Sequence, residues 1–235
     1  MVAMKRFWTA ADLVAEEGGW SVRLDGRAVR TPARALLTVP GEALARAIVA
    51  EWAAQGEEID PRTMPMTGFA NATIDRVLPA PGEFRGQIAA YAESDLFCYR
   101  AAEPEGLVAA QCGAWDPLLD WARACHAVSF TLTDGILPVD QPARTLAALR
   151  DAVEAIDPWL LAGAATLTQL GGSLVATLAL LDGAADVETL WAAVTLDERW
   201  QAEQWGEDAE ARARLDARSA DFCNAARYCD LVRAA

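Results

Sequence analysis

Hydrophobic and polar residues alternate near the start of the chain, and this pattern predicts strands. Trp20, Val22 and Leu24 alternate with polar neighbours, which is the period of a half-buried strand. The Asp-Gly pair at residues 25–26 is typical of a hairpin turn, and short extended runs follow as far as Val39. We therefore predict a small antiparallel β unit in the first forty residues.

After residue 40 the spacing of apolar residues becomes that of a helix. One face of the predicted helix contains Leu44, Ala47, Ile48 and Trp52. We place this helix near residues 41–57, and a proline-interrupted segment follows it. We expect an α+β fold, with an N-terminal β-rich domain over residues 1–62 and a C-terminal α-helical domain over residues 63–235.

Helical periodicity dominates the rest of the chain. An acid before a proline is a common helix start, so Asp116 is predicted to be the N-cap of a helix beginning at Pro117. A Gln-Pro pair at residues 141–142 predicts another start. The last two helices are expected at about residues 186–204 and 207–230, the second with a solvated, charge-alternating face.

One segment, residues 158–181, contains no charged residue and is long enough to cross a bilayer. Several threonines and the pair Gly171-Gly172 interrupt it, which favours two short buried helices that meet at the glycines. A membrane-attached factor is the alternative that this segment leaves open. We expect no membrane insertion.

Composition narrows the classes of function. The chain has 235 residues with 20 Lys+Arg against 34 Asp+Glu, a formal charge of −14. This acidity argues against binding to nucleic acid or to an anionic membrane. Five cysteines without a C-x-x-C pair indicate reduced, mostly buried thiols rather than disulfides or a zinc site. The single histidine, His126, is interpreted as a core or boundary residue.

The sequence contains no phosphate-binding loop, dinucleotide fingerprint, nucleophile elbow or zinc-protease motif, so no cofactor, metal or small-molecule substrate is expected. Three acidic pairs do occur, at residues 57–58, 197–198 and 207–208. If two carboxylates converged in a cleft, they would support a hydrolase or lyase, and this is the alternative function. Nine tryptophans within an acidic chain suit a protein partner that is basic and apolar.

Taken in order, the local motifs resemble a known family, the Atp-twelve family of chaperones that bind the alpha subunit of the F-type ATP synthase head. The resemblance runs through Lys5-Arg6-Phe7-Trp8, Leu24-Asp25-Gly26-Arg27, Thr31-Pro32, Glu51-Trp52-Ala53-Ala54-Gln55, Ile59-Asp60-Pro61, Met64-Pro65-Met66, Asn71, Asp75-Arg76, Tyr91-Ala92-Glu93-Ser94-Asp95-Leu96, Cys98-Tyr99-Arg100, Gln111, Trp115-Asp116-Pro117, Leu196-Asp197-Glu198, Gln201 and Trp205-Gly206. It covers nearly the whole chain, and no targeting extension precedes it, which suggests a bacterial member.

The resemblance implies a small N-terminal β domain followed by a larger orthogonal helical bundle, without catalysis. It also implies a function: the chaperone covers the alpha-subunit surface that later contacts the beta subunit, until the beta subunit displaces it. A cytoplasmic location follows for a bacterial member, and the mitochondrial matrix for eukaryotic relatives.

Partner-binding residues are expected at the polar and aromatic positions that match the family. The first group lies in the predicted C-terminal helices and comprises Glu198, Gln201, Trp205, Glu207 and Asp208. The second group comprises Glu51, Gln55, Asp75, Asp95, Arg100 and Asp116. A structural role is the alternative for several of them: Asp116 as a helix cap, and Asp95 and Arg100 as an ion pair across a bend.

Overall fold

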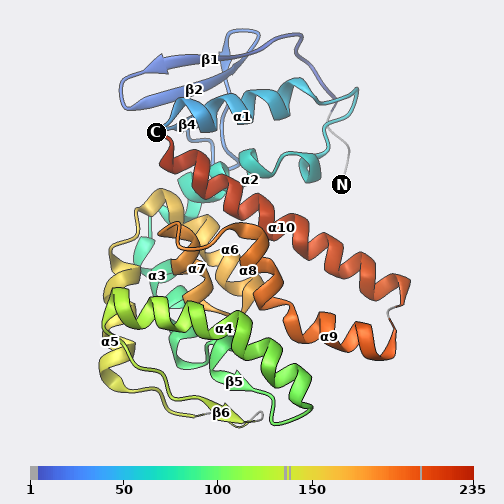
Figure 1. Ribbon diagram of the computed structural model, residues 1–235. Helices are drawn as coiled ribbons and strands as arrows, with labels where there is room; N and C mark the ends of the chain where they lie inside the picture. The colour runs from blue at the N-terminus through green and yellow to red at the C-terminus, as the bar shows by residue number, and fades with distance from the viewer. Residues whose placement is uncertain (1–4, 135–136, 138, 207) are drawn as a thin grey trace. The chain divides into compact units, whose positions relative to one another are not determined.

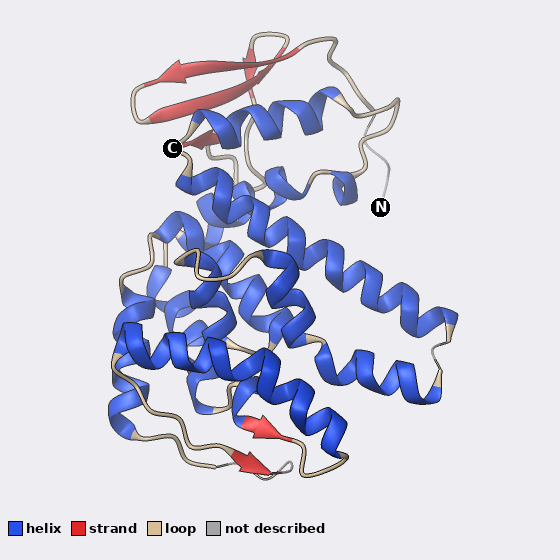
Figure 2. Cartoon of the chain, viewed as in Figure 1, coloured by secondary structure: helices blue, strands red, loops and turns tan. Residues whose placement is uncertain are grey.

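The computed structural model describes residues 5–134, 137, 139–206 and 208–235 (Figure 1). By their contacts they form two compact units. Unit 1 contains the described residues up to Pro81 together with Asp157–Gly163 and Arg227–Ala235, and unit 2 contains Gly82–Ile156 and Ala164–Ala226. A small antiparallel sheet followed by helices confirms the predicted α+β fold (Figure 2). The division after residue 62 stays a prediction.

The sheet of unit 1 is built around its second strand. Its strands are β1 (Ala11–Glu16), β2 (Gly19–Leu24), β3 (Arg27–Ala28) and β4 (Thr38–Val39). β2 pairs with β1 along its whole length, whereas the short strands β3 and β4 pair with its opposite ends. The predicted turn is confirmed, since Asp25 and Gly26 have φ angles of 47° and 77°. Such angles favour an Asp-Gly pair.

The first helix, α1 (Glu42–Ala53), packs against β1 and β2 and buries Leu44, Ala45 and Ile48 (Figure 1). It ends four residues before the predicted limit. A 3₁₀ turn (Pro61–Thr63), α2 (Pro65–Ala72) and a π-helical turn (Thr73–Val77) follow. The prolines predicted to break the helix therefore begin new helical turns. At the first position of a helix the N–H group makes no helical hydrogen bond, so proline, which lacks this group, is tolerated there.

Residues far along the chain complete the core of unit 1. The hydroxyl groups of Tyr228 and Thr73 lie 2.8 Å apart and are hydrogen-bonded. The Tyr228 ring stacks on Phe69 with centroids 5.0 Å apart, and it is fully buried. This aromatic pair joins the end of α10 (Ala209–Arg233) to α2 inside a single unit.

Unit 2 is mainly helical. Its further elements are α3 (Pro81–Ala90), two 3₁₀ turns (Tyr91–Glu93 and Leu96–Cys98), β5 (Tyr99–Arg100), α4 (Glu105–His126), β6 (Thr133–Asp134), α5 (Ala143–Glu154), α6 (Leu161–Gly171), α7 (Leu174–Leu181), α8 (Val187–Val194), α9 (Leu196–Trp205) and the first part of α10. β5 and β6 form a short parallel pair. The sequence patterns do not predict this pair.

The centre of unit 2 is α7, in which every residue from Leu174 to Leu180 is buried. α6 and α7 are separate helices because Gly172 adopts a φ of +65° and Ser173 caps α7, its Oγ accepting a hydrogen bond from the N–H of Ala176. Two short buried helices were predicted here, and that is confirmed. Within the described residues, no helix is both long and apolar enough to cross a membrane.

The predicted helix start at Asp116 is wrong. α4 begins at Glu105 and continues through Pro117, so Asp116 is not an N-cap. A buried face that includes Gln111, Trp115 and Leu119 runs continuously along the helix, and its packing outweighs the one hydrogen bond that proline removes.

Two further predictions need correction. The expected helix over residues 186–204 is divided at Thr195 into α8 and α9, and the final helix is Ala209–Arg233. All five cysteines are free, but Cys112, Cys125 and Cys223 are exposed, so the thiols are not mostly buried. These three lie on solvent-facing positions of α4 and α10, where helical geometry rather than residue type sets exposure.

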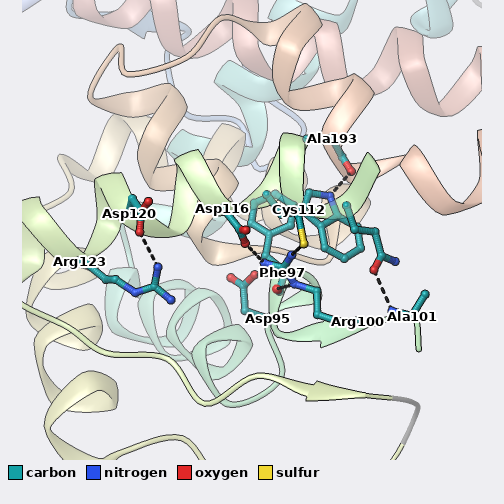
Figure 3. Close-up of polar contacts among 11 residues, drawn as sticks. Asp95, Phe97, Arg100, Ala101, Cys112, Asp116, Asp120, Arg123 and Ala193 are labelled. Carbon is teal, nitrogen blue, oxygen red and sulfur yellow. Dashed lines mark hydrogen bonds and ion pairs between the residues drawn. The ribbon is translucent and has the colours of Figure 1, made fainter. Parts of the chain in front are cut away.

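A buried carboxylate, that of Asp95, connects the loop after α3 to α7 (Figure 3). Oδ1 accepts a hydrogen bond from the N–H of Phe97 at 3.1 Å. Oδ2 accepts from the Ser173 hydroxyl at 3.1 Å and from the N–H of Val175 at 2.9 Å. Burial raises the pKa of Asp95 to about 6 against the opposing effect of these hydrogen bonds. Asp95 and Arg100 do not form the ion pair considered above, since Arg100 pairs with Asp116.

Replacing Asp95 by Asn is expected to destabilise the fold by about 2 kcal/mol at neutral pH, because an amide offers one acceptor oxygen where three donors converge. Denaturant unfolding measures this loss. The folded pKa of Asp95 lies above its unfolded value, so the wild type loses stability as pH rises from about 4 to about 6. The difference in unfolding free energy between the wild type and D95N should therefore become smaller as the pH rises over that range.

The matched control is Asp151→Asn on the exposed face of α5, which should change stability by less than about 0.5 kcal/mol. Equal unfolding curves for D95N and the wild type would contradict the anchoring role of Asp95.

Candidate functional site

The ten-residue helix α9 has no buried residue, which sets it apart among the helices of unit 2. Most helices in proteins are stabilised by burying an apolar face, so a helix without one has a surface available to a partner. α9 runs antiparallel beside the first part of α10 (Figure 1). An ion pair joins them, in which Arg218 Nη1 lies 2.8 Å from both carboxylate oxygens of Glu198.

Trp200 fixes α9 to α4. A Cβ atom added at Gly106 would lie 2.7 Å from the Trp200 ring, so the absence of a side chain at residue 106 makes room for the indole. At the start of α9, Asp197 Oδ1 accepts a hydrogen bond of 2.8 Å from Gln111 Nε2. α9 is therefore held at defined points while its remaining surface stays open to solvent.

The predicted first group of partner-binding residues lies along this open surface. Gln201 is exposed, and Trp205 at the end of α9 is 79% exposed, an unusual state for a large aromatic side chain. Asp208 is also exposed and accepts a hydrogen bond of 2.7 Å from the N–H of Ala211, so it caps α10. Glu207 lies outside the described residues.

Two grooves flank α9, and Arg199 and Glu203 line both of them. The larger groove has a volume of about 730 Å³ and lies between α4, α8 and α9. The smaller, of about 460 Å³, lies between α8, α9 and α10 and includes Trp191 and Asp216. The helix thus forms a ridge with a hollow on each side.

Arg100 and Asp116, from the second group, form an ion pair beneath α4 (Figure 3). Arg100 Nη2 lies 2.7 Å from Asp116 Oδ1, and its guanidinium lies over the Trp115 ring at 5.2 Å from the centroid. Trp115 Nε1 in turn donates a hydrogen bond of 2.8 Å to the carbonyl of Ala193 at the end of α8. These contacts stabilise the packing of α4 against β5 and α8.

The second-group residues of unit 1 are also engaged within the fold. Glu51 accepts hydrogen bonds from the N–H groups of Met66 and Thr67 at 2.7 and 2.8 Å, so it caps the start of α2. Gln55 is buried, and its Oε1 accepts from the N–H of Asp60 at 2.8 Å. Asp75 accepts hydrogen bonds from the Thr31 hydroxyl and from the N–H of Ala33.

The acidic pair at residues 197–198 does not form a convergent site, because Asp197 bonds to Gln111 in α4 whereas Glu198 pairs with Arg218 in α10. Among the described residues, no group of three or more His, Cys, Asp or Glu side chains could hold a metal ion. Burial raises the pKa of the Cys98 thiol to about 12, so it is not a reactive thiolate.

His126 is half-buried, as predicted, and its ring lies edge-on to that of Trp121 with centroids 5.4 Å apart.

The sequence patterns missed the larger groove and the residues of α9 that line it, Arg199, Trp200 and Glu203. The available signal was the occurrence of two glycines, Gly106 and Gly113, within a long amphipathic helix. Glycine inside a helix is unfavourable, and its presence there points to close packing or to an open space.

Known proteins resemble the chain in both sequence and structure. Residues 5–123 match the family described as ATP12 chaperone protein. The protein "Protein atp12, mitochondrial" of Schizosaccharomyces pombe is 24% identical over 216 residues, which cover 87% of this chain and 74% of the yeast protein.

Two crystal structures of bacterial proteins are also similar. Atp12 from Paracoccus denitrificans is 42% identical with a TM-score of 0.93, and the match covers 97% of this chain and 98% of that one. A putative chaperone from Agrobacterium tumefaciens, Atu1473, is 40% identical with a TM-score of 0.91, covering 96% and 85% of the two chains. The family match over half of the chain, together with these nearly complete structural matches, shows that the chain belongs to the ATP12 chaperone family.

Proposed function

We propose that this chain is an assembly chaperone of the F-type ATP synthase head that binds the unassembled alpha subunit. In this proposal it shields the surface of the alpha subunit that contacts the beta subunit, and the beta subunit then displaces it. The observation that supports the proposal most directly is α9, an ordered helix with no buried residue that ends at a 79% exposed tryptophan. Membership of a chaperone family supports a protein as the ligand of that open surface.

A placeholder of this kind solves a physical problem of assembly. A subunit without its neighbour exposes an apolar interface, and such interfaces favour aggregation. A temporary partner must bind the subunit more weakly than the permanent neighbour does, so that release follows by competition. No nucleotide hydrolysis is needed for that exchange.

We propose that the chain acts without catalysis. The acids at residues 197–198, which a paired-carboxylate enzyme would need to converge, bond to different helices instead. We also propose that it works in a bacterial cytoplasm, which the similarity to proteins of Paracoccus and Agrobacterium supports.

The proposed interface is the ridge of α9 with the start of α10. Trp205 and Gln201 would contact the alpha subunit directly, and Glu198 and Asp208 would provide negative charge beside them. Glu207 stays a predicted partner-binding residue. A tryptophan at the centre of a charged rim is a common arrangement in protein interfaces.

The second group of predicted residues would act differently. We propose that Glu51, Gln55 and Asp75 stabilise unit 1, and that Asp95, Arg100 and Asp116 stabilise unit 2, through their internal hydrogen bonds and ion pairs.

The first prediction concerns the complex itself. Purified chaperone and isolated alpha subunit should form a one-to-one complex in size-exclusion chromatography with light scattering, and ATP should not dissociate it. Added beta subunit should release the chaperone. A complex that persists in excess beta subunit would contradict release by competition, and absence of any complex would contradict the choice of client.

The second prediction concerns the exposed aromatic side chain. Trp205→Ala should weaken binding to the alpha subunit by about tenfold or more, as loss of an interface anchor does, while the melting temperature stays nearly unchanged. The matched control is Leu137→Ala, since Leu137 is 75% exposed and also lies in unit 2. Equal losses of affinity in the two variants would remove Trp205 from the interface.

The third prediction concerns charge. Replacing Glu198 and Asp208 together by Lys should slow association with the alpha subunit by about tenfold at low salt, with a smaller effect at about 0.5 M salt. The control replaces Asp140 and Asp151 by Lys, which changes net charge equally elsewhere in unit 2. Stopped-flow kinetics measures the association rates of both double variants, and circular dichroism verifies that they are folded. If the control slowed association as much, net charge alone would explain the effect.

A further inference from the structure

The larger groove beside α9 has the size and lining of a site for another protein's side chains. Its volume of about 730 Å³ accommodates several side chains of leucine size. Most of its lining is apolar, with Leu118, Trp121, Leu196 and Trp200 among small residues of α4 and α8. Small residues leave the space open, and the large ones provide apolar area for an occupant to cover.

Two hydrogen-bond acceptors lie at this groove without their usual partners. Pro117 has no N–H, so the carbonyl of Gly113, four residues earlier, lacks the donor that an α-helix normally provides, and both residues line the groove. Glu203 is exposed, and no hydrogen bond or ion pair of its side chain occurs among the described residues. Both acceptors suit a donor that is positively charged.

The acidic charge of the whole chain also favours a basic occupant. From Val187 to Trp205, α8 and α9 contain four acidic side chains and one basic side chain, Arg199. In the groove lining itself Arg199 and Glu203 contribute one charge of each sign, so the preference comes from the chain's formal charge of −14, which attracts a basic segment and repels a second copy of this chain.

We infer that the groove between α4, α8 and α9 binds an amphipathic segment of the alpha subunit, with leucine-sized side chains in the groove and a Lys or Arg beside Glu203 and the carbonyl of Gly113. This inference rests on the proposed function and extends it. The exposed surface of α9 would supply charge and Trp205, and the groove would supply the apolar contact that resists dissociation.

Gly113 allows a direct test, because a Cβ atom built there meets no other atom within 4 Å. Gly113→Phe therefore begins its side chain in open space and adds a ring at the groove, and it replaces a poor helix former. Purified alpha subunit is the probe, and isothermal calorimetry measures its dissociation constant. We expect G113F to weaken binding by at least about tenfold, because the occupant loses its apolar contacts.

The matched control is Gly68→Phe in α2, an exposed helical glycine of unit 1 that also has no atom near a built Cβ. It should bind the alpha subunit as the wild type does. Unchanged binding by G113F, with melting temperatures equal to that of the wild type, would overturn the groove inference and leave the proposed function standing. Absence of binding by the wild type itself would instead refute the proposed function.

The position of the basic side chain is tested separately with Glu203→Gln, which removes the charge and keeps the shape. It should weaken binding severalfold at low salt and less at high salt. A photoreactive benzoylphenylalanine placed at Ala110 should cross-link to an alpha-subunit peptide that contains both apolar and basic residues. Cross-links to a second copy of this chain, with concentration-dependent dimers in sedimentation, would contradict the inference.

Discussion

Burial of α7 is the constraint on which unit 2 depends. Every residue from Leu174 to Leu180 is at most 7% exposed, so other parts of the unit must cover this helix on all sides. α4 and α8 supply part of that cover, and the carboxylate of Asp95 fixes the start of α7 from the loop after α3. α9 lies outside this enclosure: it contacts α4 and α8, but none of its residues is buried, and its remaining surface is available to a partner.

Several acidic residues that resemble the family's motifs make hydrogen bonds or ion pairs within the fold. Glu51 caps α2, Asp75 holds the turn after β3, and Asp116 neutralises the buried Arg100. Carboxylates in such positions are costly to replace because the donors that they satisfy would be left unpaired. A motif shared with a family can therefore be needed for folding as well as for binding.

The sequence allows prediction of the elements with strong local signals. The Asp25-Gly26 hairpin and the two helices meeting at Gly172 follow from turn chemistry and from an uncharged run. The start of α4 could not be predicted, because its buried face overrides the local preference of Pro117. The sequence indicated Trp205 as a partner-binding residue, but it could not predict the larger groove beside α9, because that groove forms from helices brought together from distant parts of the chain.

Unit 1 contains residues from both ends of the chain, and this has a consequence for biosynthesis. Its core includes Tyr228, Cys229 and Val232, and a Cβ atom at Gly41 would lie 2.7 Å from the side chain of Ala235, so residues 227–235 pack against the rest of this unit. A ribosome makes the sheet and α1 long before those residues. The core of the unit consequently stays incomplete until residues 227–235 have left the exit tunnel.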